Sequence, residues 1–67
     1  MNNQRGVISR EELIDIIRVR NDFASRFKSI DPELIDAEIA ALALNGGMRG
    51  DELRLAMERF IKSLHNI

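Results

Sequence analysis

The side chains that most often carry out chemistry are scarce in this chain and poorly grouped. The chain has no cysteine, and its single histidine, His65, lies near the C-terminus. Nucleophilic catalysis needs a base beside a hydroxyl or thiol group, and no hydroxyl is convincingly placed beside His65. A bundle of this size also has little room for a substrate pocket. The chain is therefore predicted not to be an enzyme.

Two other groupings suggest ligands only weakly. Glu11 and Asp15 are one helical turn apart, a spacing that can hold a divalent cation, but two carboxylates on a surface helix are usually solvated. Gly46, Gly47 and Gly50 form a glycine cluster. A phosphate-binding loop also needs a lysine and a preceding strand, and this cluster has neither. No metal or cofactor is expected.

Charged residues form a basic segment followed by an acidic one. The members are Arg18, Arg20, Arg26 and Lys28, then Asp31, Glu33, Asp36 and Glu38. One interpretation is a nucleic-acid-binding surface formed by the basic segment and by an N-terminal arm with Arg5 and Arg10. The favoured interpretation is that each segment complements the dipole of its own helix end and that the two neutralise one another. A nucleic-acid-binding transcriptional regulator is kept as the alternative function.

Composition limits the remaining classes. The 67 residues carry a formal net charge of −1, and 31% are charged, so the overall charge favours neither a polyanion nor an anionic membrane as partner. We expect no signal peptide and no membrane span, and thus a soluble, cytoplasmic protein. Small domains without disulfides are often stabilised by oligomerisation, which makes self-association plausible.

Local signals mark the first helix, predicted over residues 9–29 after a flexible arm, residues 1–8. Ser9 and Glu12 have the spacing of a capping box, and Ile8 and Leu13 have that of a hydrophobic staple. The apolar face is wider than a simple amphipathic stripe; it comprises Leu13, Ile16, Ile17, Ala24 and Phe27, flanked by Ile14, Val19, Phe23 and Ile30. This width indicates more than one neighbour.

The second helix, over residues 32–45, is the most apolar segment and is expected to be central. Asp31 suits the N-cap and Pro32 the first helical position, while Gly46 and Gly47 suit a C-cap. The predicted helix carries apolar residues on nearly all of its sides. Leu34, Ile35, Ile39 and Leu42 lie on one side, and four alanines and Leu44 lie on the other.

Residues 48–50 are predicted to be either a flexible connector or a loosely formed first turn. A third helix is then expected over residues 50–66, capped by Gly50 or Asp51. Its single apolar face comprises Leu53, Ala56, Met57, Phe60, Ile61, Leu64 and Ile67. The predicted fold is all-α, a three-helix bundle that begins with an antiparallel helical hairpin. Residues 9–67 form one domain, dimerised through the first two helices.

Two charges interrupt the predicted apolar faces. Arg20 lies among the apolar positions of the first helix, and Glu38 among those of the second. An unpaired buried charge is costly, so the two can form a pair within the chain or across a dimer interface. Alternatively, Arg20 extends to water along Phe23 and Glu38 lies at the bundle edge.

The predicted function is a small, non-enzymatic protein–protein interaction module that self-associates. It would act as an adaptor, an inhibitor or an accessory subunit, with a second copy or another protein as partner. The candidate interface residues are Ile14, Ile17, Arg20, Glu38, Ala40, Ala43, Leu44 and Leu55.

Overall fold

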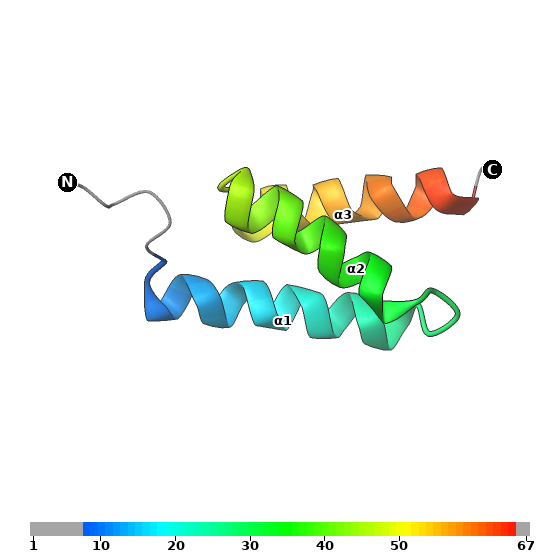
Figure 1. The fold of residues 1–67 in the computed structure, drawn as a ribbon, viewed down its shortest axis with the longest axis horizontal. Coiled ribbons are helices and arrows are strands. Elements are labelled where there is room, and N and C mark those ends of the chain that lie inside the picture. Colours follow the sequence, from blue (N-terminus) through cyan, green and yellow to red (C-terminus); the bar gives the residue numbers. More distant parts are fainter. Residues whose placement is uncertain (1–7, 66–67) are drawn as a thin grey trace.

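The computed structural model describes residues 8–65, which form three helices and no strand (Figure 1). Helix α1 spans Arg10–Arg26, α2 spans Pro32–Ile39 and continues directly into a π-helix, η1 (Ala40–Asn45), and α3 spans Gly50–His65. The predicted all-α, three-helix class is confirmed. Most of the predicted N-terminal arm and Ile67 lie outside the described residues. No helix within residues 8–65 is long and apolar enough to cross a bilayer.

Helix α1 begins with the predicted capping box. The Glu12 amide donates to the Ser9 hydroxyl, and the Ser9 amide donates to the Glu12 carboxylate, both at 3.1 Å. The helix ends at Arg26, three residues before the predicted end at residue 29. It ends there because Phe27 leaves helical geometry, with φ −122° and ψ 65°.

The second helix changes its winding partway along. The Asp31 carboxylate caps α2 by accepting from the Glu33 amide at 3.0 Å. From Ala40 onward the segment is a π-helix rather than the ordinary helix that the sequence predicts. The Gly46 amide accordingly donates to the Ala41 carbonyl, five residues back, at 3.0 Å.

Two adjacent glycines end η1 for different reasons. Gly47 has a φ of +74°, a left-handed conformation that glycine adopts without steric cost. Gly46 has ordinary helical backbone angles, but a Cβ atom there would lie 2.7 Å from the Leu42 carbonyl oxygen. Substitution of Gly46 is therefore restricted by lack of space, and substitution of Gly47 is restricted by the backbone conformation.

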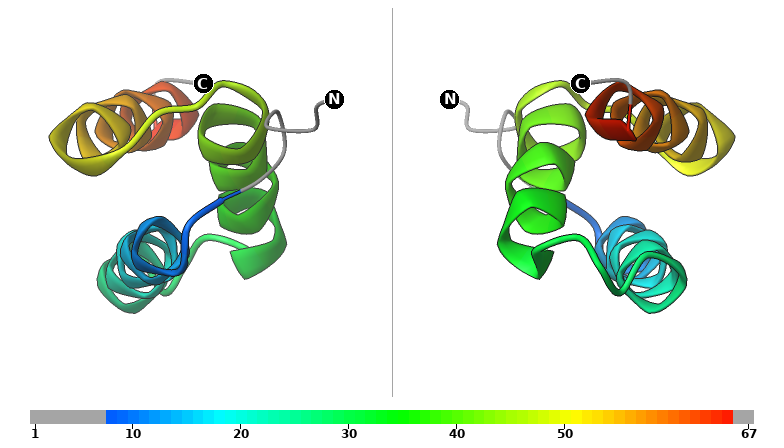
Figure 2. Two further views of the ribbon diagram at one scale, coloured as in Figure 1. Left: turned by 90° about the vertical axis from the view of Figure 1, so that its left-hand side faces the viewer. Right: turned by 90° about the vertical axis from the view of Figure 1, so that its right-hand side faces the viewer.

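Helices α1 and α3 lie on the same side of α2 and run in the same direction (Figures 1 and 2). Helix α2 returns obliquely and packs against both. Each of the three helical segments contributes three residues to the buried core. These are Ile16, Val19 and Phe23 from α1, Ile35, Ile39 and Ala43 from α2–η1, and Leu53, Met57 and Ile61 from α3.

Three residues that were expected on core-facing surfaces are exposed instead. The exposed fractions are 45% for Leu13, 47% for Ile17 and 48% for Leu34. Leu13 lies one turn before Ile16, the first buried residue of α1. For the other two the reason is that each helix buries only a stripe of residues three or four apart, and a residue next to a buried one points about 100° away from it. Leu34 and Ile17 each directly neighbour a buried isoleucine, Ile35 and Ile16 respectively.

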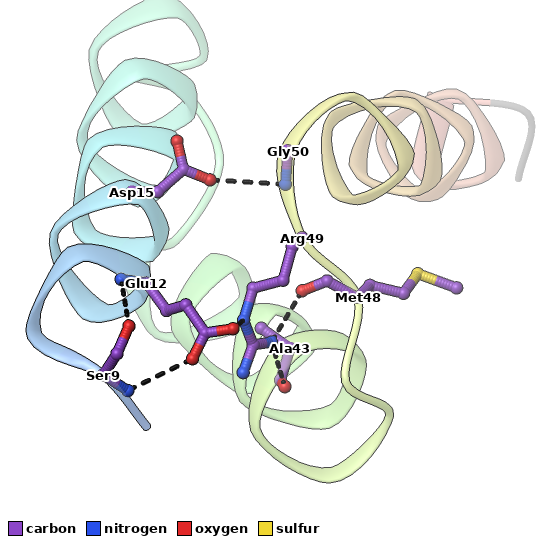
Figure 3. A network of polar contacts seen from close by, with 7 residues as sticks. All are labelled: Ser9, Glu12, Asp15, Ala43, Met48, Arg49 and Gly50. Carbon is purple, nitrogen blue, oxygen red and sulfur yellow. Dashed lines mark hydrogen bonds and ion pairs between the residues drawn. The ribbon is translucent and has the colours of Figure 1, made fainter. Parts of the chain in front are cut away.

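The connector before α3 is anchored, which corrects the alternative that it is flexible. Arg49 Nη1 donates to the carbonyl oxygens of Ala43 and Met48, both at 2.8 Å (Figure 3). Arg49 Nε lies 3.5 Å from Glu12 Oε2, a charge contact. The side chain therefore joins the end of η1 to the first turn of α1.

A carboxylate from α1 caps α3. Asp15 Oδ2 accepts from the Gly50 amide at 3.3 Å (Figure 3). Asp15 Oδ1 lies 4.0 Å from Arg54 Nη1. Negative charge at a helix N-terminus is favourable. The sequence predicted a local cap from Gly50 or Asp51, whereas this one comes from 35 residues away.

Candidate self-association surface

Large apolar side chains are exposed to an unusual extent for so small a core. The exposed fractions of six of them lie between 42% and 50%, and five of the six lie on α1 and on α2–η1. They are Leu13, Ile14 and Ile17 on α1, Leu34 and Leu44 on α2–η1, and Leu55 on α3. Contiguous exposed apolar area commonly marks a site of protein association, so their relative positions matter.

An ion pair defines which sides of α1 and α2 face one another. Arg20 Nε donates to Asp36 Oδ1 at 2.7 Å, and this hydrogen bond raises the pKa of Arg20. Within the described residues, Glu38 takes part in no ion pair. A pair of Arg20 with Glu38 within the chain, one of the alternatives considered from the sequence, is therefore not formed. Glu38 lies two residues beyond Asp36 and so points about 200° away from it.

Helical spacing places several apolar side chains beside this ion pair. Leu13 and Ile17 precede Arg20 by seven and three residues, so they lie on the same side of α1. Ala40 and Leu44 follow Asp36 by four and eight residues. Even allowing for the wider turn of η1, both remain on the side of α2–η1 that carries Asp36.

Both apolar groups extend toward the same end of the molecule, because α2 runs obliquely back from the end of α1 toward the start of α3 (Figure 1). The Arg20–Asp36 pair thus adjoins a set of exposed and half-buried apolar residues on the two helices. We call it the α1–α2 patch. It consists of Leu13, Ile17, Ala40 and Leu44, with Ile14 adjoining Ile17 on α1.

Three of the predicted interface residues do not belong to this patch: Glu38, which points away from Asp36, Ala43 and Leu55. Ala43 is completely buried in the core of the chain, so it is unavailable to a partner and is removed from the candidates. Leu55 is 49% exposed but follows the buried Leu53 by two residues, which places it on the outward side of α3. Ile14, Ile17, Ala40 and Leu44 remain as candidates.

Sequence reasoning missed two contributors to the patch. Leu13 was expected in the core, and Asp36 was assigned only to a diffuse acidic segment. The seven-residue spacing between Leu13 and Arg20 could have indicated the position of Leu13, because it places Leu13 on the same side of α1 as the charged Arg20. The choice of Asp36 over Glu38 depends on how α2 is rotated about its axis.

The basic segment of α1 is partly neutralised. Arg20 is paired with Asp36, and Arg26 Nη1 lies 3.3 Å from Asp22 Oδ2. Within residues 8–65, no three His, Asp or Glu side chains are grouped so that they could hold a metal ion. Of the two residues considered as a possible cation site, Glu11 and Asp15, Asp15 instead caps α3.

The site that emerges is an apolar surface on two helices, bordered by a matched pair of opposite charges. Such a surface suits contact with another protein surface, because apolar area is buried without leaving a net charge to be desolvated. No protein-family model matches the chain, and no curated protein or solved structure is significantly similar to it.

Proposed function

We propose that this chain is a non-enzymatic helical interaction module that self-associates through the α1–α2 patch. The observation that carries the proposal is the half-exposed state of Leu13, Ile17 and Leu44, at 45%, 47% and 50%. These side chains extend from one ion pair over two neighbouring helices. Burying them against a second copy would add apolar stabilisation to a core of only nine residues.

Charge at the edge of the patch is compatible with a second copy as the partner. In a symmetric dimer the same surface meets itself, so a patch bordered by one sign of charge would repel its copy. Arg20 and Asp36 neutralise one another at this border. A module of this kind would act by binding alone, as an adaptor, an inhibitor or an accessory subunit.

The test is molar mass by light scattering during size-exclusion chromatography over a wide concentration range. We expect a mass near twice the 7.7 kDa of the chain at high concentration. Ile17→Glu should reduce the mass to that of one chain, because it places a charge in the centre of the interface. Circular dichroism should show that the variant keeps its helical content, since Ile17 is half exposed.

Leu55→Glu is the matched control. Leu55 and Ile17 are exposed to nearly the same extent, 49% and 47%, and differ in the surface they occupy. Leu55→Glu should therefore retain the dimer mass. A folded monomer at every concentration, or equal loss of the dimer in both variants, would reject the proposed interface.

A further inference from the structure

A hollow lies at the end of the molecule where α1 and α3 both finish. Its volume is about 370 Å³, and it is lined by Arg26, Phe27, Glu58, Ile61, Lys62 and His65. Helices α1 and α3 run in the same direction (Figure 1), so the side chains of both C-terminal turns converge there. The hollow is distinct from the α1–α2 patch, whose α1 residues lie in the first half of that helix.

The base of the hollow is apolar and well supported. Ile61 is 3% exposed and belongs to the core. Phe27 packs against that core, and its ring is stacked on Phe23 with 5.9 Å between ring centroids. An apolar group placed in the hollow would therefore contact side chains that are already fixed by packing.

The rim of the hollow is mainly cationic. The Arg26 guanidinium lies over the rings of both Phe23 and Phe27, at 5.1 Å from each centroid, and its contact with Asp22 orients it further. Lys62 contributes a second cation from α3. Among the described lining residues Glu58 is the one carboxylate, so these residues carry a formal charge of +1 when His65 is neutral.

We propose that this hollow binds a small amphipathic carboxylate, a molecule with a short apolar body and one anionic head. The volume lies within the range of small-molecule sites. The apolar body would contact Phe27 and Ile61, and the carboxylate would accept charge-assisted hydrogen bonds from both Lys62 and Arg26. The negative ends of the two helix dipoles also lie at this hollow and disfavour an anion, so binding of the carboxylate depends on its direct contact with the two cationic side chains.

Octanoate is a suitable probe, used below the concentration at which it self-assembles. In a ¹H–¹⁵N NMR titration of the full chain, octanoate should give saturable shifts at the amides of Phe27, Ile61 and Lys62. Octanol lacks the charge and acetate lacks the apolar body, so each should bind at least about tenfold more weakly, as expected when one charge-assisted or apolar contribution is lost.

Paired variants test the assigned charge. Lys62→Gln should weaken octanoate binding about tenfold, whereas Arg59→Gln should leave it unchanged. Arg59 is an exposed cation on the same helix that does not line the hollow. Equal binding of octanol and octanoate, equal effects of the two variants, or shifts confined to the α1–α2 patch would overturn the proposal.

Discussion

The two ends of the helical bundle are held together by different kinds of contact. At the end where α1 begins, Arg49 and Asp15 join helices by directional bonds to backbone atoms (Figure 3). We call this the junction end. At the opposite end, the aromatic end, α1 finishes with the stacked rings of Phe23 and Phe27 and with Arg26 above them.

The contacts at the junction end mainly fix the local geometry, and those at the aromatic end mainly stabilise the fold. Exposed or half-exposed ion pairs contribute little free energy, but hydrogen bonds to particular carbonyl oxygens fix where a loop lies. A buried aromatic side chain has the opposite character, since its large apolar area stabilises the fold and its contacts are less directional. We therefore expect substitutions at the aromatic end to reduce stability most and substitutions at the junction end to alter local order.

The largest effect is expected from Phe23→Ala at the aromatic end. Phe23 is fully buried, and removing such a side chain typically costs about 3–5 kcal/mol. For a domain of this size that loss is comparable to the whole stability, so circular dichroism should show a largely unfolded chain at 25 °C. Leu55→Ala, at an exposed position outside the α1–α2 patch, serves as the control. A cooperative melt of Phe23→Ala close to that of the original chain would contradict this account of the aromatic end.

An intermediate effect is expected from Arg49→Ala at the junction end. The substitution removes two hydrogen bonds, to the carbonyls of Ala43 and Met48. We expect a loss of about 1–3 kcal/mol in the free energy of unfolding by urea. Amide hydrogen exchange at Gly47, whose N–H donates to the same Ala43 carbonyl at 3.1 Å, should become faster.

Arg49→Lys sharpens this test. Lysine keeps the positive charge near Glu12 but loses the planar group that reaches two carbonyls, so its stability should fall between that of Arg49→Ala and the original chain. If Arg49→Lys is as stable as the original chain, charge alone holds the connector. If Arg49→Ala unfolds the chain as Phe23→Ala does, the contrast between the two ends is wrong.

The smallest effect is expected from Glu12→Gln and depends on pH. The hydrogen bond from the Ser9 amide, with a contribution from Arg49, lowers the pKa of Glu12 below its usual value of 4.5. Its ionised form is thus favoured in the folded state. The associated stability is present above pH 4.5 and is lost as the pH falls through the lower, folded-state pKa.

The measurement is the difference in free energy of unfolding between the original chain and Glu12→Gln at several pH values. The difference should favour the original chain at pH 6 and shrink toward pH 3. Glu11→Gln, which removes a charge from the same first turn of α1, is the control. A difference that stays constant over this range would show that the charge of Glu12 does not contribute to the stability of the junction end.

Features that depend on near neighbours were predictable from the sequence. The capping box of Ser9 and Glu12 and the Asp31 cap each involve residues within three positions, and both are present. Contacts between helices were not predictable, because they depend on how each helix is rotated. This applies to the choice of Asp36 by Arg20 and to the Asp15 cap of α3.

The π-helix and the patch were missed for related reasons. Alanine and leucine are strong α-helix formers, so nothing in residues 40–45 signals a wider turn. The apolar surplus of the first two helices was recognised from the sequence, but the division into core and surface was not. That division placed Leu13 outside the core and Ala43 inside it.

The paired glycines after η1 also have an evolutionary consequence. At position 46 the limiting factor is the 2.7 Å approach of any Cβ to the Leu42 carbonyl, so every other amino acid should be selected against to a similar degree. At position 47 there is open space and only the positive φ is restrictive, a condition that asparagine tolerates better than most residues. Diverged versions of this chain should therefore keep glycine at 46 and alternate between glycine and asparagine at 47.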